Sequence, residues 1–377
     1  MKVIVAGDFA PRARLAKQIE ERKFSEVFPE DVRKVIKSAD FSFVNFESPV
    51  AEEGYHPIPK CGPNLKCTPE AAEAVRYAGF TGVTMANNHI LDYGAEGLRK
   101  SIECCKDQGL DVVGVGENLS EAEKILYLEK EGKKLAIINC CEHEFSIASD
   151  ATAGANPLNP ILQYYAIQEA KKQADYVLVI VHGGHELFQL PSPRMQETYR
   201  FFIDAGADAV VNHHQHCYSG YEVYNGKPIF YGLGNFGFDW ENRTSGVWTE
   251  GFFVCVDFDE KLGIKYESFP YRQYATLPSI CLLDSPEQVI FNESVNNLNA
   301  VINNITLLNE AVSNYYADCM KYELDRLEPY NKPWQYYLYN KGLLPKVMNN
   351  TKCMSLLSHV TCESHLDKLI YALKNKK

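Results

Sequence analysis

The chain has 377 residues, of which 46% are hydrophobic and 23% are charged, and its formal net charge at pH 7 is −11. This composition is typical of a folded globular protein, and the length allows two or three domains. The negative charge argues against a nucleic-acid-binding surface, which is normally basic, so we expect no nucleic-acid partner. No apolar stretch approaches the roughly 20 residues that a membrane-spanning helix needs, so we expect no membrane span.

The N-terminal segment and the cysteines favour a cytoplasmic protein. Residues 1–8 are too short and too soon polar for a signal peptide, and they predict a first core strand instead. The chain has twelve cysteines but no Cys-x-x-Cys pair. We interpret them as reduced and mostly buried thiols, as expected in the cytoplasm.

Strands alternate with helices over residues 1–280, and antiparallel strands follow toward the end of that span. We expect strands at 2–6, 40–45, 81–86, 111–115 and 176–181, and helices at 68–79, 95–108 and 192–206. We expect hairpins at 126–140, 222–232 and 252–269, the last two turning at Asn225-Gly226 and Leu262-Gly263. Ser120 and Glu123 have the spacing of a capping box at another helix start. This mixture predicts an α/β protein with two packed sheets and helices outside.

The composition changes near residue 285, where Asn, Leu, Tyr and Lys become frequent and helical spacing continues through residues 292–327. We therefore predict two parts, a domain over residues 1–280 and a mostly helical C-terminal extension over residues 281–377.

A histidine cluster follows a short apolar run at residues 209–211, where the chain reads Val-Val-Asn-His-His-Gln-His over residues 210–216. On an extended strand end, His214 and His216 would point the same way because side chains alternate. Two imidazoles on one face suit a divalent metal. A polar loop without metal is the alternative for such a cluster.

Polar residues follow four other predicted strands in the same manner. Ligands of sheet-based α/β proteins gather beyond the carboxyl ends of strands. Taken singly, each of these residues has a structural explanation as a turn, a solvated group or a helix cap. Taken together, they are the donors of a divalent-metal site. The residues concerned are Asp8 after the first strand, Asn45 and Glu47 after the second, Asn87, Asn88 and His89 after the third, and His182, His185 and Glu186 after a later strand.

The motifs resemble those of the CapA capsule-synthesis (poly-gamma-glutamate biosynthesis) family, within the calcineurin-like metallophosphoesterase superfamily. The resemblance covers about residues 1–270. The motifs that carry it are Gly7-Asp8, Asn45-Phe46-Glu47, Asn87-Asn88-His89-Ile90-Leu91-Asp92-Tyr93-Gly94, His182-Gly183-Gly184-His185-Glu186, His213-His214-Gln215-His216 and Gly232-Leu233-Gly234-Asn235-Phe236. The resemblance implies a four-layer α/β/β/α metallophosphoesterase-like sandwich with a metal centre at the strand ends.

Site roles follow from the same resemblance. It implies that one or two divalent ions (Mn, Zn, Fe or Mg) bind to Asp8, Glu47, Asn88, His182, His214 and His216. We therefore expect these six side chains to converge in one pocket. The resemblance also implies that His89 assists the leaving group beside Asn88. The superfamily usually begins with Asp-x-His, whereas Phe9 and Ala10 follow Asp8 here. One ligand is therefore missing from one ion position, which keeps a single-ion centre open.

The resemblance implies metal-dependent hydrolysis of a phosphoester or a related anionic bond. The substrate would be a small or polymeric anion. The partner would be the machinery that makes a capsule, poly-gamma-glutamate or a surface polysaccharide. We expect substrate contacts from Asn45, Lys66, Glu186, His213 and Asn235. For Lys66, an ordinary solvated lysine is the alternative. A factor that binds metal and an anionic polymer without turnover, for capsule assembly or export, is the second hypothesis. Ligation or hydrolysis of gamma-glutamyl amides is the third.

Overall fold

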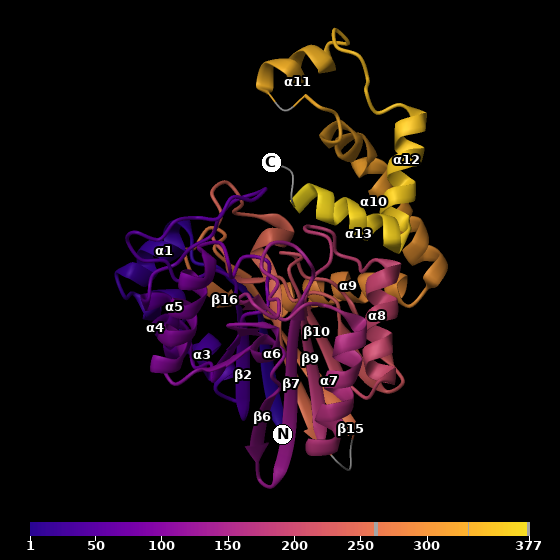
Figure 1. The fold of residues 1–377 in the computed structure, drawn as a ribbon. Helices are drawn as coiled ribbons and strands as arrows, with labels where there is room; N and C mark the ends of the chain where they lie inside the picture. The colour runs from indigo at the N-terminus through magenta and orange to yellow at the C-terminus, as the bar shows by residue number, and fades with distance from the viewer. Residues whose placement is uncertain (260–262, 331, 375–377) are drawn as a thin grey trace. The chain divides into compact units, whose positions relative to one another are not determined.

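The structure is a computed structural model that describes residues 1–259, 263–330 and 332–374 (Figure 1). The chain divides into two compact units, Met1–Asn309 and Glu310–Lys377. The first unit contains two large mixed sheets, and the second is helical.

The first sheet has eight strands in the order β16-β15-β14-β1-β2-β3-β4, with β13 paired to the end of β1. The strands are β1 (Lys2–Phe9), β2 (Phe41–Phe46), β3 (Gly82–Thr84), β4 (Asp111–Val113), β13 (Asn235–Gly237), β14 (Glu250–Asp259), β15 (Gly263–Gln273) and β16 (Ile280–Leu282). Strands β1 to β4 are parallel, so their carboxyl ends meet at one edge. The turn expected at Leu262-Gly263 includes residues 260–262, which lie outside the described residues.

The second sheet has six strands in the order β11-β12-β10-β9-β7-β6. They are β6 (Leu126–Lys130), β7 (Lys133–Cys141), β9 (Tyr176–His182), β10 (Ala209–His213), β11 (Tyr221–Tyr224) and β12 (Lys227–Phe230). Strands β7, β9, β10 and β12 are parallel. A separate ribbon pairs β5 (Val115–Gly116) with β8 (Gly154–Ala155).

The two sheets pack face to face, and helices cover their outer faces (Figure 1). Along β1, Val3 and Val5 enter the core between the sheets, whereas Ile4 and Ala6 face the helices, as strand alternation requires. The first sheet is covered by α1 (Ala13–Glu20), α2 (Phe24–Val27), α3 (Glu30–Ile36), α4 (Glu70–Ala78) and α5 (Gly94–Asp107), and the second by α7 (Pro160–Gln173) and α8 (Pro193–Asp204). The expected four-layer α/β/β/α sandwich is therefore confirmed.

Most of the predicted strands and hairpins are confirmed, including the turn with positive φ at both Asn225 and Gly226. The predicted capping box at Ser120 is wrong, because α6 (Leu119–Ala122) starts earlier, where Asn118 Oδ1 accepts a hydrogen bond from the backbone N–H of Glu121.

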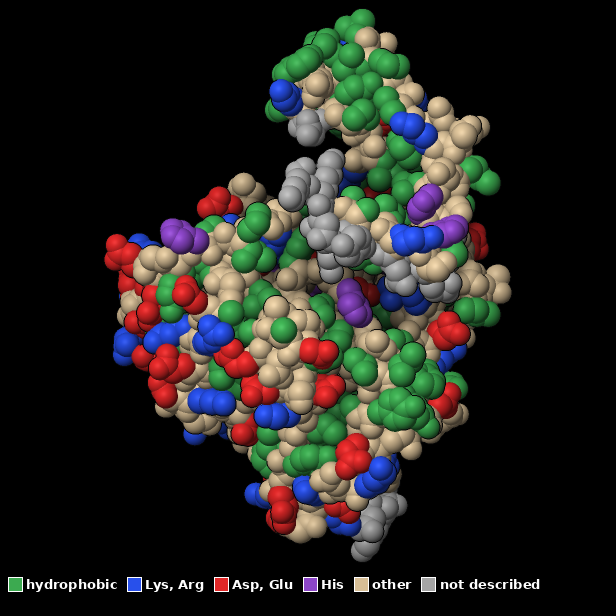
Figure 2. All heavy atoms as spheres, in the orientation of Figure 1, with side chains coloured by type: hydrophobic (Ala, Val, Ile, Leu, Met, Phe, Trp, Pro, Cys, Tyr) green, Lys and Arg blue, Asp and Glu red, His purple; other side chains and the backbone are tan. Residues whose placement is uncertain are grey.

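We did not anticipate α7. Its apolar side chains do not form one stripe, and Ile161 and Tyr165 are exposed. Figure 2 shows hydrophobic side chains gathered over α7 and α8.

The first unit extends beyond the boundary that we placed at residue 280. Helix α9 (Ser285–Ile302) contributes Phe291 and Val295 to the core between the sheets. The remaining helices are α10 (Ile305–Arg326), α11 (Pro333–Asn340), α12 (Asn350–Thr361) and α13 (Glu363–Lys374), which confirms a helical C-terminal region. Across the described residues, no helix combines the length and apolarity that crossing a bilayer requires.

Candidate metal centre

Six polar side chains from both sheets are buried at the carboxyl ends of the parallel strands, and each is at most 6% exposed. Three belong to the first sheet and three to the second: Asp8 in β1, Glu47 after β2, Asn88 after β3, His182 at the end of β9, and His214 and His216 after β10. These segments are far apart in the chain, and the packing of the two sheets brings them together.

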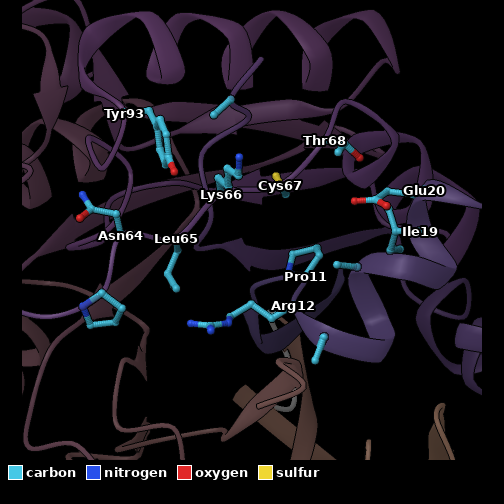
Figure 3. Close-up of a pocket in the computed structure, with 14 residues that line it drawn as sticks. Pro11, Arg12, Ile19, Glu20, Asn64, Leu65, Lys66, Cys67, Thr68 and Tyr93 are labelled. Atoms are coloured by element: carbon cyan, nitrogen blue, oxygen red, sulfur yellow. The ribbon is translucent and has the colours of Figure 1, made fainter. Parts of the chain in front are cut away.

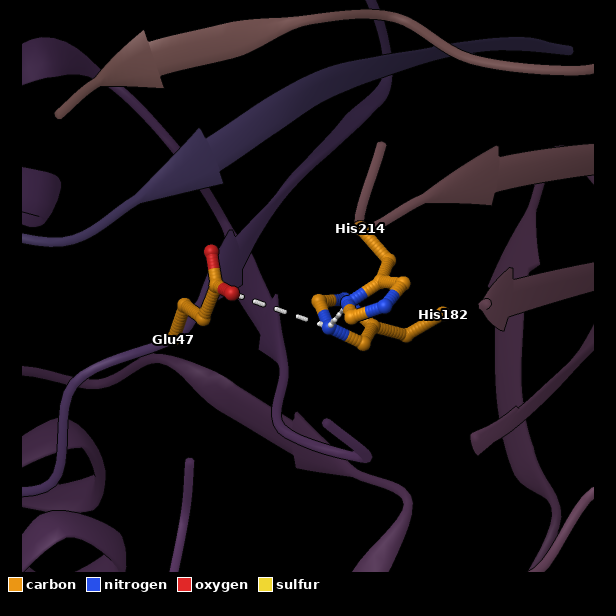
Figure 4. Close-up of side chains that lie close together, drawn as sticks. All are labelled: Glu47, His182 and His214. Carbon is orange, nitrogen blue, oxygen red and sulfur yellow. Dashed lines mark hydrogen bonds and ion pairs between the residues drawn. The ribbon is translucent and has the colours of Figure 1, made fainter. Parts of the chain in front are cut away.

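One group of donor atoms surrounds the His182 ring. Its Nε2 atom lies 3.0 Å from Asn88 Oδ1, 3.0 Å from His214 Nδ1 and 3.6 Å from Glu47 Oε1. Figure 4 shows Glu47 pointing toward the paired imidazoles. The structure thus brings these four side chains together.

A second group shares Glu47. Nε2 of His216 lies 3.7 Å from Glu47 Oε1, and its Nδ1 lies 3.4 Å from Asp8 Oδ2. Within each of the two triads, Glu47–His182–His214 and Asp8–Glu47–His216, the donor atoms lie within 4.8 Å of one another. The arrangement thus offers two adjoining cation positions that have one carboxylate in common.

The chemistry of the site fits a divalent cation. Both carboxylate oxygens of Glu47 are buried, and neither has a hydrogen-bond partner among the described residues. A buried carboxylate without partners is unfavourable, and a cation would satisfy it. Burial, reinforced by the nearby charge of Asp8, raises the pKa of Glu47 well above its usual range. Carboxylate, amide and imidazole donors together suit hard or borderline divalent ions.

Acidic and imidazole groups in the cluster influence each other strongly. Burial alone would raise the pKa of Asp8, but the hydrogen bond with His216 and the charge of His182 hold it well below its usual range. Burial alone would lower the pKa of His216, but Glu47 and Asp8 raise it to about 9. Burial and the neighbouring His214 lower the pKa of His182. Asp8 and His216 therefore favour each other's charged form.

Two asparagines that we expected to contact substrate lie behind the cluster instead. The side-chain amide of Asn45 donates to Asp8 Oδ1 at 2.7 Å and lies 3.2 Å from His182 Nδ1. Asn235 Oδ1 lies 3.0 Å from His216 Nδ1, and its amide nitrogen donates to the His216 carbonyl. Both asparagines are fully buried. From these positions, Asn45 can orient the side chains of Asp8 and His182, and Asn235 can orient that of His216.

The other three expected substrate contacts lie in different environments. His213 is buried, and its Nδ1 lies 3.8 Å from Asp8 Oδ1. Glu186 is exposed. Lys66 is also exposed and lines a pocket described below.

His89 belongs to a buried network that we only partly anticipated. Its Nδ1 lies 2.7 Å from Asp92 Oδ2, which also accepts a hydrogen bond from the backbone N–H of Leu65. Lys60, whose side chain is 2% exposed, forms an ion pair with Asp92 Oδ1 and lies 3.0 Å from His89 Nδ1. The contact with Asp92 is the shorter of the two, and an ionised carboxylate only accepts, so we assign to Nδ1 a proton that is donated to Asp92. Lys60 then pairs with Asp92 and not with the imidazole, and Nε2 is left for other partners. Burial lowers the pKa of His89, although Asp92 opposes this effect.

Two residues of this region were missed in the sequence. Lys60 lies in a polar loop, where a lysine normally indicates a solvated side chain. Glu144 accepts a hydrogen bond from the side-chain amide of Asn88 at 2.9 Å, so that Asn88 Oδ1 is turned toward His182. For Asp92 the sequence did carry a signal, since it follows His89 by three residues within a motif that we had singled out.

The expectation that strand alternation aligns His214 and His216 is wrong. Strand β10 ends at His213, and the two histidines have φ angles of 91° and 53°. Non-glycine residues rarely adopt this left-handed region, and such strain concentrates at functional sites. The backbone N–H of His214 donates to Asp8 Oδ2 at 3.1 Å, which helps to hold this conformation.

The family model and the curated relatives that match this chain point to the same family. Residues 2–240 match the family model described as bacterial capsule synthesis protein PGA_cap. The chain is 36% identical over 247 residues to the capsule biosynthesis protein CapA of Bacillus anthracis, covering 63% of this chain and 60% of that protein. It is 34% identical over 229 residues to the PGA biosynthesis protein CapA of Bacillus subtilis (strain 168), covering 60% of each.

The chain thus spans about 60% of the length of these curated relatives. A solved structure of a phosphatase from Mycoplasma pneumoniae aligns with 73% of this chain and 95% of its own, at 15% identity and a TM-score of 0.45. The match to the family model covers more than half of the sequence. The chain therefore belongs to the bacterial capsule synthesis protein family PGA_cap.

Proposed function

We propose that this chain is a metal-dependent hydrolase of a phosphoester or a related anionic bond. The observation that carries the proposal is the convergence of three histidines, the Asp8 carboxylate and the Asn88 amide around Glu47. The buried oxygens of Glu47 have no hydrogen-bond partner among the described residues.

The proposed ligands form two sets. Glu47, Asn88, His182 and His214 would hold one ion, and Asp8, Glu47 and His216 would hold a second. A divalent ion bound there would polarise the substrate oxygen and lower the pKa of a water to roughly 7. Asn45, Asn235 and Glu144 would keep the ligand side chains in the binding orientation.

His89 is the proposed proton carrier. Asp92 accepts a hydrogen bond from Nδ1–H of His89 and fixes the ring. Nε2 is therefore left to take a proton from the attacking water and to return it to the leaving group. Lys60 and the backbone N–H of Leu65 hold the Asp92 carboxylate in place. These contacts support a fixed position for the proton carrier.

The relatives' names concern capsule and PGA biosynthesis in two bacilli. We therefore propose an anionic polymer or its precursor as substrate and the capsule-synthesis machinery as partner. We also propose a cytoplasmic location, which the free thiols of all twelve cysteines favour.

The second candidate is a protein that binds metal and an anionic polymer without turnover. Phe9 and Ala10 supply no ligand after Asp8, so the Asp8–Glu47–His216 triad offers only three donors. An incompletely held second ion favours binding over hydrolysis, because the two-ion clamp on attacking and leaving oxygens would be weak.

A metal-loading and turnover assay tests both candidates. The purified chain is incubated with Mn²⁺, Zn²⁺, Fe²⁺ or Mg²⁺, its metal content is measured, and turnover of p-nitrophenyl phosphate and bis-p-nitrophenyl phosphate is followed. If the chain is a hydrolase, we expect turnover by the unmodified protein. His89→Ala and Asp8→Ala should each lower it by about 100-fold or more, because the first loses proton transfer and the second loses metal binding. His56→Ala, at an exposed histidine, is the matched control. Full metal loading without turnover supports the binding candidate, and absence of metal uptake overturns both.

A further inference from the structure

A pocket of about 480 Å³ lies between the start of α1 and residues 63–68. Figure 3 shows that Arg12, Lys66 and Tyr93 line it, with Glu20 placed near Thr68 at another part of the wall. The pocket is not part of the residue cluster described above, and the proposed hydrolysis assigns it no role.

The pocket contains two cations, Arg12 and Lys66, for which the described residues provide no anionic partner. Within the part of the chain that the structure describes, the side chains of Arg12 and Lys66 form no ion pair and no hydrogen bond, and each lies instead against an aromatic ring. The Arg12 guanidinium is 3.9 Å from the centre of the Trp240 ring, and Lys66 Nζ is 5.8 Å from that of Tyr93. Cation–π contact holds both groups in place without neutralising them. In a chain of net charge −11, such a pair of cations attracts an anion.

An aromatic wall, formed by Phe238, Trp240 and Trp248, connects the pocket to the metal centre. Arg12 lies on Trp240, which contacts Trp248 with ring centres 5.9 Å apart. Trp248 and Phe238 in turn contact the His216 ring, at 5.2 and 5.1 Å. The same wall therefore supports a pocket cation and a candidate metal ligand.

A second connection runs through Leu65, which lines the pocket. Its backbone N–H donates to Asp92 Oδ2, the oxygen that also contacts His89. Tyr93, the ring beside Lys66, directly follows Asp92. The pocket is thus linked to His216 through the aromatic wall, and to His89 through Leu65 and Asp92.

We propose that this pocket is a subsite for a second anionic group of the substrate, bound by Arg12 and Lys66 while the reacting bond lies at the metal centre. The inference rests on the proposed function, since it concerns the substrate of the same site. It narrows the substrate to molecules with at least two separate anionic groups. A carboxylate and a phosphate both suit this pair of cations, because a guanidinium binds either group through two hydrogen bonds and an ammonium binds either as a point charge.

Calorimetric titration of the metal-free protein tests the subsite separately from hydrolysis. The full chain is treated with a chelator and titrated at low ionic strength with glutarate and, in a second arm, with inorganic phosphate. We expect at least one probe to bind, and Arg12→Gln and Lys66→Gln each to weaken that binding about tenfold. The better probe identifies a carboxylate or a phosphate as the natural group. Lys124→Gln makes the same charge change as Lys66→Gln at an exposed lysine outside the pocket, and it should leave affinity unchanged.

The subsite is overturned if neither probe binds, or if all variants bind with the affinity of the unmodified chain. Thermal unfolding of each variant checks that Arg12→Gln does not disturb the aromatic wall. The experiment needs neither metal nor turnover. A chain that binds the probe through Arg12 and Lys66 but hydrolyses nothing would therefore contradict the proposed function and leave the subsite intact.

Discussion

Oε1 of Glu47 lies 3.6 Å from Nε2 of His182, across the junction between the two sheets. Glu47 follows β2 of the first sheet, and His182 ends β9 of the second. A cation held between them would join the sheets at their carboxyl edges. Metal binding is therefore expected to stabilise the fold as well as to serve chemistry.

Divalent metal should raise the melting temperature of the unmodified chain. A ligand at 100 times its Kd stabilises the folded state by about 2.7 kcal/mol, which differential scanning fluorimetry detects as a shift of a few degrees. Glu47→Gln should abolish the shift, because it removes the charge common to both triads. An equal shift in Glu47→Gln would contradict the assignment of this carboxylate.

The number of metal ions bound by single-residue variants should show whether the two triads bind ions independently. His216→Ala should keep the ion held by Glu47, His182 and His214, while His182→Ala should lose it. Mass spectrometry of the desalted proteins measures the number of ions per chain. An equal number of ions per chain in both variants would show that the two positions do not bind ions independently.

Lys60→Met should destabilise the fold by about 3–5 kcal/mol, because it leaves the fully buried Asp92 carboxylate without its cation. Urea unfolding measures the change in free energy. Lys34→Met is the control: Lys34 pairs with Glu30 on the surface, and both side chains are more than 70% exposed. A surface pair contributes little, so this control should unfold like the unmodified chain.

Gly7→Ala should cost about 3 kcal/mol or more, because the added Cβ would lie 1.8 Å from the Gly234 carbonyl oxygen and backbone cannot move aside cheaply. The close approach lets Asp8 N–H donate to that same oxygen. In Gly109→Ala, the new Cβ meets open space, and only the φ of 69° opposes it, for about 1 kcal/mol. Comparable losses for the two variants would show that crowding at Gly7 is unimportant.

Much of the site was visible in the sequence for a simple reason. Asp8, Glu47 and His182 each follow an apolar run that predicts a buried strand, and parallel strands end at a common edge. The strand ends could therefore be grouped before their positions were known. The geometry of His214 and His216 could not be predicted in this way. Both residues have a left-handed backbone after the end of β10, and His214 N–H contacts Asp8, which is 206 positions away in the chain.

The sequence by itself determined the two-sheet architecture and the residue types available for a cation, since apolar periodicity and local turn signals are properties of neighbouring residues. Only the tertiary structure decided that Lys60 is buried against Asp92, that Asn45 and Asn235 stand behind the ligands, and that α9 completes the core. Whether a polar side chain is solvated, paired or enclosed depends on segments far away in the chain, which local patterns do not encode.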